Sequence, residues 1–291
     1  MTKRVSLLLL VILLGAWSAQ ALAEDWVCPM TNHAKVFAAP GDCPQCGMAL
    51  VKRADRDKRL AMEAEAAAGR GAGADIKPPA NGKIPVAFVI SKGAVMIDFT
   101  GPWEVFQDVY MAGRGKEMDD QMPFQLFTVS DSRNPIHVSG GMTIVPDYTF
   151  DNAPTPRVII VPAQGSSDKM LQWLRAMHPK VDVLASVCTG AFIVARAGLL
   201  DGKEATTHHD SYGTFATQNP KVKLVRGRRY VQSDAVVSTA GGLSSGIDLA
   251  LHIVQRYFGR DVAEQTAEYM EYQGTGWKTP ATTGAALSAR R

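Results

Sequence analysis

Residues 157–162 read Arg157-Val158-Ile159-Ile160-Val161-Pro162. The four consecutive aliphatic residues in this stretch indicate a β-strand that is buried on both faces, as in a parallel sheet. Similar apolar runs occur at residues 84–90, 124–129 and 181–187, and residues 170–177 have helical patterning. Strands that alternate with helices predict an α/β fold with a mostly parallel sheet covered by helices on both faces.

Further segments extend this pattern. Residues 137–145, interrupted by Gly140-Gly141, predict a bent strand or a hairpin of two short strands. A helix is predicted to open at Thr100-Gly101-Pro102, because a proline in the first turn costs no helical hydrogen bond. Near the end of the chain, apolar residues at helical spacing predict a long helix packed on the core; they are Ile247, Ala250, Leu251, Val254 and Phe258. The earlier helix would carry Trp103, Phe106 and Tyr110 on one side.

The segment Ser186-Val187-Cys188-Thr189-Gly190-Ala191 joins the end of a predicted strand to the start of a helix. Ligands of open α/β folds bind at the carboxyl ends of the strands, and a sharp strand-to-helix turn exposes a nucleophile. The positive end of the helix favours a thiolate, which predicts a lowered pKa for Cys188. The N–H of Thr189 can donate to an anion that forms on a substrate. The alternative is a buried structural cysteine.

This segment is one of a series of motifs that occur in the order of a known family. The others are Asp98-Phe-Thr-Gly-Pro102-Trp-Glu-Val105, Ala197-Gly-Leu-Leu-Asp-Gly202, Ala205-Thr-Thr-His208 and Gly241-Gly-Leu-Ser-Ser-Gly-Ile-Asp248. On these motifs, residues 84–275 resemble the ThiJ/PfpI superfamily, which has a class I glutamine amidotransferase-like fold, and most closely its isonitrile hydratase-like branch. The resemblance implies a flavodoxin-like three-layer sandwich with a mostly parallel sheet, and a homodimer.

The resemblance also implies roles for individual residues. Cys188 matches the nucleophile, and Asp98 matches an acidic residue across the pocket, placed just before the first helix. Thr189 follows the nucleophile where protease-like members have His, and His208 matches a pocket histidine. Asp98 has an alternative role as a turn or helix-capping residue, and His208 as a histidine with a structural hydrogen bond.

One motif departs from the family. Relatives have Pro-Gly-Gly after the strand that ends at Val161, and this backbone supplies an anion-binding N–H. Here the run is Pro162-Ala163-Gln164-Gly165. The side chain of Ala163 or Gln164 can hinder the backbone geometry that glycine allows, whereas the amide of Gln164 can itself donate to a substrate. We therefore assign Ala163, Gln164 and Gly165 as candidate substrate or oxyanion residues.

The motifs favour a cysteine-dependent hydratase or hydrolase that acts on a small electrophilic substrate, with no cofactor in the catalytic domain. The alternative is a non-enzymatic metal-binding or stress-sensing protein, in which Cys188 reacts with oxidants. A formal charge of +3, from 31 basic and 28 acidic residues, is too small to indicate a nucleic-acid partner. Regulators of this family carry a helix-turn-helix region beyond the shared domain, and we expect none after Thr275.

The first residues have the features of a secretory signal. Lys3 and Arg4 precede an apolar run at residues 7–14, and Ala21-Leu22-Ala23 has the small-x-small pattern of a cleavage site. This run is shorter than the roughly 20 residues of a membrane-spanning helix. We therefore expect a signal peptide at residues 1–23, a periplasmic or extracellular mature protein, and no stable membrane anchor after cleavage.

A small cysteine module follows at residues 24–51. Cys43 and Cys46 are three positions apart, a spacing at which two thiolates converge on one ion, and Cys28 supplies a third sulfur. His33 is the candidate fourth ligand, with Met30 and Met48 as other possibilities. The segment resembles the small heavy-metal-binding domain of copper-transporting ATPases and efflux proteins, although that family has His directly after Cys-Pro-Met. A zinc or copper ion is expected, and a disulfide is the alternative.

Two segments are expected to carry no chemistry. Residues 52–83 are rich in Ala and charged residues, then in Gly and Pro, and predict a linker that includes a short solvated helix. Residues 276–291 predict a flexible tail. The ThiJ/PfpI-like domain lies between them at residues 84–275.

Overall fold

The computed structural model describes residues 25–28, 35–44, 49–58, 75–79, 82–111, 114 and 117–279. The chain divides into two compact units, Met1–Met62 and Glu63–Arg291. Within the described residues, no helix is long and apolar enough to cross a membrane. The predicted signal peptide lies outside these residues.

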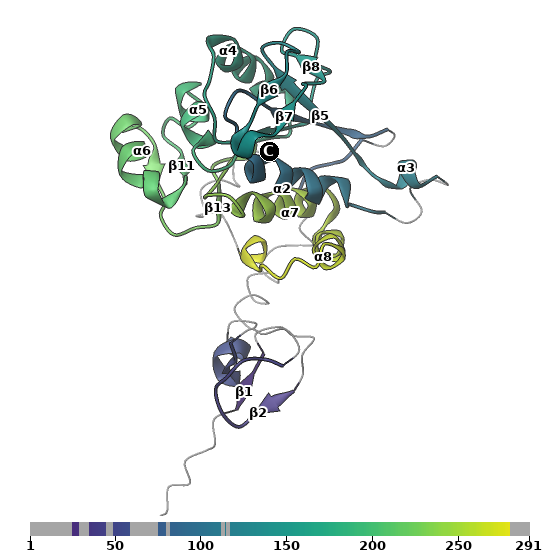
Figure 1. The fold of residues 1–291 in the computed structure, drawn as a ribbon, viewed down its shortest axis with the longest axis vertical. Coiled ribbons are helices and arrows are strands. Elements are labelled where there is room, and N and C mark those ends of the chain that lie inside the picture. Colours follow the sequence, from purple (N-terminus) through teal and green to yellow (C-terminus); the bar gives the residue numbers. More distant parts are fainter. Residues whose placement is uncertain are drawn as a thin grey trace, which may run out of the picture. The chain divides into compact units, whose positions relative to one another are not determined.

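The larger unit is built on one seven-stranded sheet (Figure 1). Every neighbouring pair of strands in it is parallel except β13 and β14, which are antiparallel. The α/β fold with a mostly parallel sheet is therefore confirmed. In spatial order the strands are β13 (Tyr230–Gln232), β14 (Val237–Ala240), β10 (Val183–Ser186), β9 (Val158–Val161), β4 (Ile84–Val89), β5 (Phe124–Ser130) and β8 (Tyr148–Thr149).

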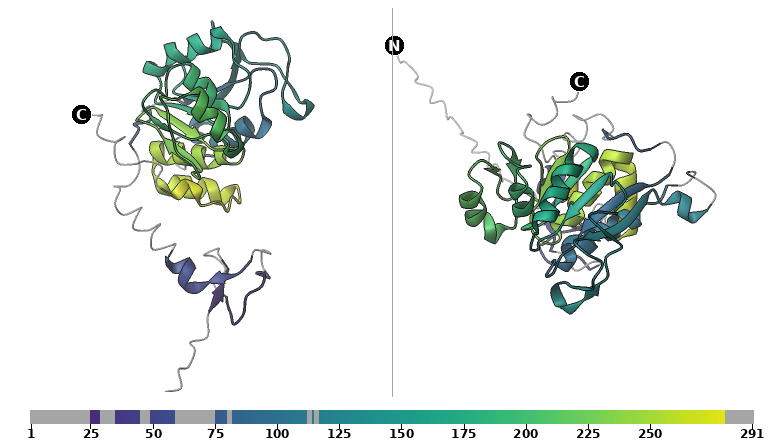
Figure 2. Two further views of the ribbon diagram at one scale, coloured as in Figure 1. Left: turned by 90° about the vertical axis from the view of Figure 1, so that its left-hand side faces the viewer. Right: turned by 90° about the horizontal axis from the view of Figure 1, so that it is seen from above.

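Helices cover both faces of this sheet, which gives three layers. Because side chains alternate along a strand, Val86 and Phe88 of β4 join one hydrophobic cluster, while Ala87 and Val89 join another. The first cluster packs under α2 (Met96–Gln107), α7 (Ser245–Phe258) and α8 (Arg260–Tyr269). The second packs under α4 (Asp168–Met177), α5 (Gly190–Arg196) and α6 (Tyr212–Gln218). Figure 2 shows α4 and α8 on opposite sides of the sheet.

The first helix of the larger unit begins earlier than the sequence predicts. Helix α2 starts at Met96, whose N–H donates to the hydroxyl of Ser139 at 2.8 Å, so Pro102 lies inside the helix rather than in its first turn. Tyr110 follows the end of the helix and is exposed. The prediction that the helix opens at Thr100 is wrong, because an anchor distant in the sequence fixes the start.

Short elements complete the larger unit. Strands β6 (Ile136–His137) and β7 (Thr143–Ile144) pair antiparallel across Gly140 and Gly141, which confirms the predicted hairpin. Outside the main sheet, β11 (Glu204–Ala205) pairs with β12 (Lys223–Leu224), and α3 (Met118–Gln121) precedes β5.

Parts of the predicted linker (residues 52–83) and of the predicted tail (residues 276–291) pack against the core of the larger unit. In the linker, Asp75 forms an ion pair with the buried Arg256 of α7, and Ile76 packs on the core. Near the C-terminal end of the described residues, Trp277 is buried, and its backbone N–H donates to Oδ1 of Asp248. The prediction of a loose tail is therefore wrong for residues 276–279, because the indole of Trp277 gains more from burial than the chain loses by being ordered.

The smaller unit contains a three-stranded antiparallel sheet. Its order is β2 (Val36–Phe37), β1 (Trp26–Val27) and β3 (Val51–Lys52), and residues 53–58 continue as a helix. Among the described residues of this unit, Cys28, Cys43 and Leu50 form a buried cluster, with Trp26 and Phe37 packed against them.

Candidate active site

Cys188 lies at a strained turn directly after strand β10. Its backbone φ angle is 57°, a value that residues other than glycine rarely adopt. Gly190 begins α5 two residues later, and a Cβ atom there would lie 2.2 Å from the carbonyl oxygen of Val161. Glycine is therefore required for the helix to pass so close to strand β9. This backbone is the strand-to-helix turn that the sequence predicts for a nucleophile.

Asp98 lies in the first turn of α2, not just before the helix as predicted, because the helix begins at Met96; its side chain is fully buried. Its Oδ2 accepts a hydrogen bond of 3.0 Å from the N–H of Ala163, whereas Oδ1 is buried and accepts no hydrogen bond of standard geometry from the described residues. Burial raises the pKa of Asp98 to about 6, even though the N–H groups of Ala163 and Leu243 and the thiol of Cys188 act in the opposite direction. The carboxyl group is therefore poised to exchange a proton near neutral pH.

The thiol of Cys188 is protonated at neutral pH. Burial, and then the charge of Asp98, raise its pKa to about 11, while the N–H of Thr189, the N–H of Leu243 and the hydroxyl of Thr189 lower it. The predicted lowering of this pKa is therefore wrong. Helix α5 has only seven residues, and its dipole is outweighed by the loss of water around a buried sulfur.

Leu243 is a site residue that we did not single out from the sequence. Its φ is 53°, and its N–H approaches both Asp98 and Cys188. The loop that carries Leu243 is also hydrogen-bonded to the nucleophile, because the N–H of Cys188 donates to the carbonyl of Gly241 at 2.8 Å. The Gly-Gly pair before Leu243 was the available signal, but the strained backbone of Leu243 became visible only in the structure.

The Ala163-Gln164-Gly165 segment was predicted to bind a substrate or oxyanion, but its polar groups are engaged within the protein. The N–H of Ala163 is engaged by Asp98, so it is not available to a substrate anion. The side chain of Gln164 is held by the end of β4, where its Nε2 donates to the carbonyl of Val89 at 2.7 Å and its Oε1 accepts from the N–H of Ser91. The carbonyl of Gly165 accepts from the Ser91 hydroxyl. These contacts position the first turn of α2 and its carboxylate.

His208 lies beside the loop that carries Leu243. A Cβ atom on Gly242 would lie 2.1 Å from Cδ2 of His208, so the imidazole rests directly on the glycine backbone. The Nδ1 of His208 accepts from the N–H of Asp210 at 3.3 Å. The preceding Thr207 donates its hydroxyl to the carbonyl of Cys188 at 2.9 Å, which ties this segment to the nucleophile turn.

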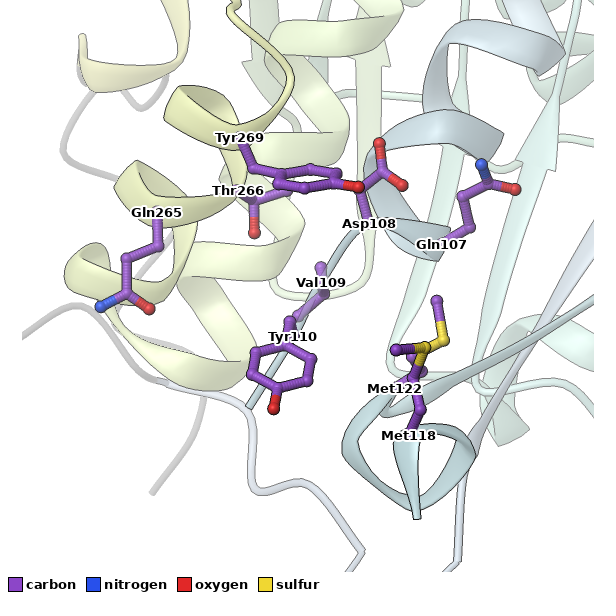
Figure 3. Close-up of a pocket in the computed structure, with 9 residues that line it drawn as sticks. All are labelled: Gln107, Asp108, Val109, Tyr110, Met118, Met122, Gln265, Thr266 and Tyr269. Carbon is purple, nitrogen blue, oxygen red and sulfur yellow. The ribbon is translucent and has the colours of Figure 1, made fainter. Parts of the chain in front are cut away.

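Two of the cavities on the larger unit are candidate binding sites. One, of about 490 Å³, is lined by Thr189 and Gln164 together with Phe192, Arg196, Gln218 and Asn219, so it adjoins the nucleophile turn. The other, of about 390 Å³, lies between the end of α2, α3 and α8 (Figure 3). Its exposed apolar side chains, Tyr110, Met118 and Tyr269, belong to none of the catalytic motifs. We therefore assign the first cavity to the candidate site.

The smaller unit brings two of the predicted metal ligands together. Cys28 and Cys43 are buried in one cluster, although 15 positions separate them. A pair of neighbouring sulfurs fits a soft or borderline ion, because thiolates select zinc and Cu(I). The other predicted ligands, Cys46 and His33, lie outside the described residues.

Comparison with family models supports both units. Residues 85–256 match the DJ-1/PfpI family, and residues 26–53 match the heavy metal binding domain. The isonitrile hydratase of Pseudomonas putida is 29% identical over 198 residues, which cover 65% of this chain and 78% of the relative. The transcriptional regulator GbdR of Pseudomonas aeruginosa is 28% identical over 155 residues, which cover 52% of this chain and only 42% of the regulator.

Solved structures have the same fold. A THiJ/PfpI family protein from Pseudomonas syringae superposes with a TM-score of 0.57 at 23% identity, over 70% of this chain and 79% of that one. DJ-1beta of Drosophila melanogaster superposes with a TM-score of 0.55 at 16% identity, over 66% of this chain and all of that one (100%). The chain therefore belongs to the DJ-1/PfpI family and carries a heavy metal binding domain ahead of the family domain.

Proposed function

We propose that the larger unit is a cysteine-dependent hydratase of the isonitrile hydratase type. The observation that carries this proposal is the pairing of Cys188, on a backbone with positive φ, with the buried carboxyl group of Asp98. The similarity to the isonitrile hydratase of Pseudomonas putida supports this choice of reaction. The candidate catalytic set is Cys188, Asp98, Thr189 and His208, to which the structure adds the N–H of Leu243.

The two pKa values define the resting state. Near pH 7, Asp98 with a pKa of about 6 is mostly ionised, and Cys188 with a pKa of about 11 carries its proton. Oδ1 of Asp98 is thus the acceptor for the thiol proton when sulfur bonds to an electrophilic carbon. The general base lies next to the nucleophile, so a low thiol pKa is not required.

The proposed reaction with an isonitrile then has three steps. Sulfur adds to the terminal carbon, and Asp98 takes the thiol proton and delivers it to that carbon, which gives a thioimidate bound to Cys188. Water adds across the carbon–nitrogen double bond. The resulting tetrahedral adduct expels the sulfur, which regains a proton, and releases an N-substituted formamide. The N–H of Leu243 stabilises negative charge at the sulfur during addition and expulsion.

A substrate screen tests this proposal. We expect purified protein to hydrate small isonitriles to formamides, and Cys188→Ala to abolish turnover. Asp98→Asn should lower kcat by about 10²–10⁴-fold, the usual contribution of a general acid–base group. Glyoxals and simple amides serve as comparison substrates. Turnover that survives Cys188→Ala, or preference for one of the comparison substrates, would contradict the assignment.

The smaller unit supports a second activity, the binding of a heavy metal ion. The match to the heavy metal binding domain and the shared burial of Cys28 and Cys43 favour zinc or copper held by Cys28, Cys43, Cys46 and His33. Such a protein would act as a metal-binding or stress-sensing protein without turnover. Deleting residues 24–51 separates the two functions: an enzyme keeps its activity, whereas a metal-dependent phenotype disappears. Elemental analysis after reconstitution under reducing conditions should find one ion, and its absence would exclude the site.

Export and dimerisation complete the proposal. The mature protein is proposed to start at Glu24 in the periplasm or outside the cell and to form a homodimer. N-terminal sequencing of protein from fractionated cells tests the first point, and an N-terminus at Met1 would contradict it. Sedimentation at micromolar concentration tests the second, and a single monomeric species would contradict it.

A further inference from the structure

Three consecutive side chains next to the nucleophile turn have metal-binding chemistry. His208 precedes the short 3₁₀ helix His209–Ser211, and its neighbours His209 and Asp210 occupy the first turn. One ligand atom from each of the three residues lies within 4.8 Å of the others. Two imidazoles and one carboxylate thus converge without any contribution from the cysteine module.

The carboxylate of Asp210 lies between the two imidazoles. Its Oδ1 is 3.1 Å from Nε2 of His209, and its Oδ2 is 3.8 Å from Nδ1 of His208. This Nδ1 accepts a hydrogen bond of 3.3 Å from the N–H of Asp210, which a bound ion would replace. Ligand atoms that lie about 2.0–2.2 Å from a tetrahedral zinc ion are about 3.3–3.6 Å from one another, so donors within 4.8 Å need to close by at most about 1.5 Å. The side chains of His209 and Asp210 are 73% and 77% exposed, which leaves them free to make this adjustment.

His208 provides a fixed point for such a site. Its side chain is 21% exposed, and its ring is held against the backbone of Gly242. The hydroxyl of Thr207, one residue earlier, is bound to the carbonyl of Cys188. The partly buried His208 is therefore held by the core of the domain, and the two exposed ligands are on its solvent side.

We propose that His208, His209 and Asp210 form a second metal site that binds a divalent ion of the zinc, nickel or copper(II) type. Imidazole nitrogen and carboxylate oxygen suit these ions, whereas the sulfurs of the cysteine module suit softer ones. Three protein ligands leave one or more positions for water or an external ligand. The site is open, so its affinity is lower than that of a closed structural zinc site.

Zinc titration of the full chain tests the proposal. Cys28→Ser, Cys43→Ser and Cys46→Ser remove the sulfur ligands first, so that any bound zinc reports on the remaining sites. In this background we expect calorimetry to find one zinc ion per chain. His209→Ala with Asp210→Asn should weaken binding by at least about tenfold, because changes even in the partners of metal ligands have effects of that size.

The control variant is His137→Ala, which removes another exposed histidine, on β6. It should leave the zinc affinity unchanged. Equal melting temperatures of the variants without zinc would show that the substitutions have not disturbed the fold. The proposal is overturned if the triple Cys→Ser protein binds no zinc, or if zinc binds equally well after the His209 and Asp210 substitutions.

Discussion

At the scale of single residues, the site is defined by a thiol and a carboxyl group that compete for one proton. Asp98 is ionised at neutral pH despite complete burial, and its charge raises the pKa of Cys188. A reactive cysteine next to a cationic group would behave in the opposite way. The reactivity of Cys188 should therefore depend on Asp98 rather than on the helix that follows it.

Alkylation by iodoacetamide measures this dependence. In protein without the three module cysteines, the rate at Cys188 should rise about tenfold per pH unit from pH 7 to 10, because only the thiolate reacts. Asp98→Asn removes the nearby charge and should speed alkylation at pH 8. Asp119→Asn, on the exposed helix α3, should have no effect. A rate that is constant above pH 7 would show that the thiol pKa is low.

The raised pKa of Asp98 also predicts a cost in stability. Folding favours the neutral carboxyl group, because the folded-state pKa is about 6 rather than its ordinary value of 3.8. The contribution of this group to stability is complete below about pH 4 and is lost as the pH rises through 6. A shift of about two units corresponds to roughly 3 kcal/mol. Asp98→Asn should therefore be more stabilising in urea unfolding at pH 8 than at pH 4, by up to about that amount. An equal effect at both pH values would contradict this.

At the scale of elements, the nucleophile turn depends on how closely α5 passes β9. The nearest atoms to a Cβ at position 190 are backbone atoms, the carbonyl oxygens of Val161 and Pro162, which cannot rotate away. A second close approach joins α2 to α7, where a Cβ on Gly101 would lie 3.0 Å from the side chain of Ile247. The helices and strands around the site therefore approach one another closely at positions where glycine has no side chain to keep them apart.

Gly190→Ala should lower the free energy of unfolding by about 3 kcal/mol or more, since overpacking against a fixed backbone forces the strand and helix apart. The matched control is Gly213→Ala in α6, where a Cβ has no atom within 4 Å. There alanine should be neutral or stabilise by up to about 1 kcal/mol, its advantage over glycine in a helix. Urea unfolding of both variants measures the difference, and similar effects at the two positions would refute the packing argument.

The helices and strands also show which structural features can be predicted from local sequence patterns. The buried strands β4, β5, β9 and β10 and the helix α7 were predicted because their apolar patterns are set by local periodicity. The start of α2 was missed, because it depends on a hydrogen bond from Met96 to Ser139, 43 positions away. Local signals therefore identify elements, whereas their ends depend on contacts distant in the sequence.

At the scale of the whole molecule, the segment that precedes β4 within the larger unit is fastened to the core by contacts with the buried Arg256. The guanidinium of Arg256 donates to both carboxylate oxygens of Asp75, and the N–H groups of Asp75 and Ile76 donate to the carbonyl of Arg256. The folded domain therefore includes residues that composition alone assigns to a linker.

Asp75→Ala should destabilise the larger unit by about 2–3 kcal/mol, because a buried guanidinium loses its charged partner. Asp119→Ala is the comparison, since its ion pair with Lys83 is at the surface and contributes about 1 kcal/mol or less. Thermal unfolding measures both. If Asp75→Ala has an effect no larger than Asp119→Ala, residues 75–79 are only a spacer.

The sequence by itself determined the α/β fold, the family, the metal-binding module, and Cys188 and Asp98 as a candidate pair, because each of these rests on local patterns or motifs. Only the tertiary structure decided the direction of the Cys188 pKa shift, the engagement of the Ala163 N–H by Asp98, and the arrival of Leu243 beside both groups. Burial and close approach arise from segments far apart in the chain. They set the local dielectric and the hydrogen bonds, and no local pattern in the sequence encodes them.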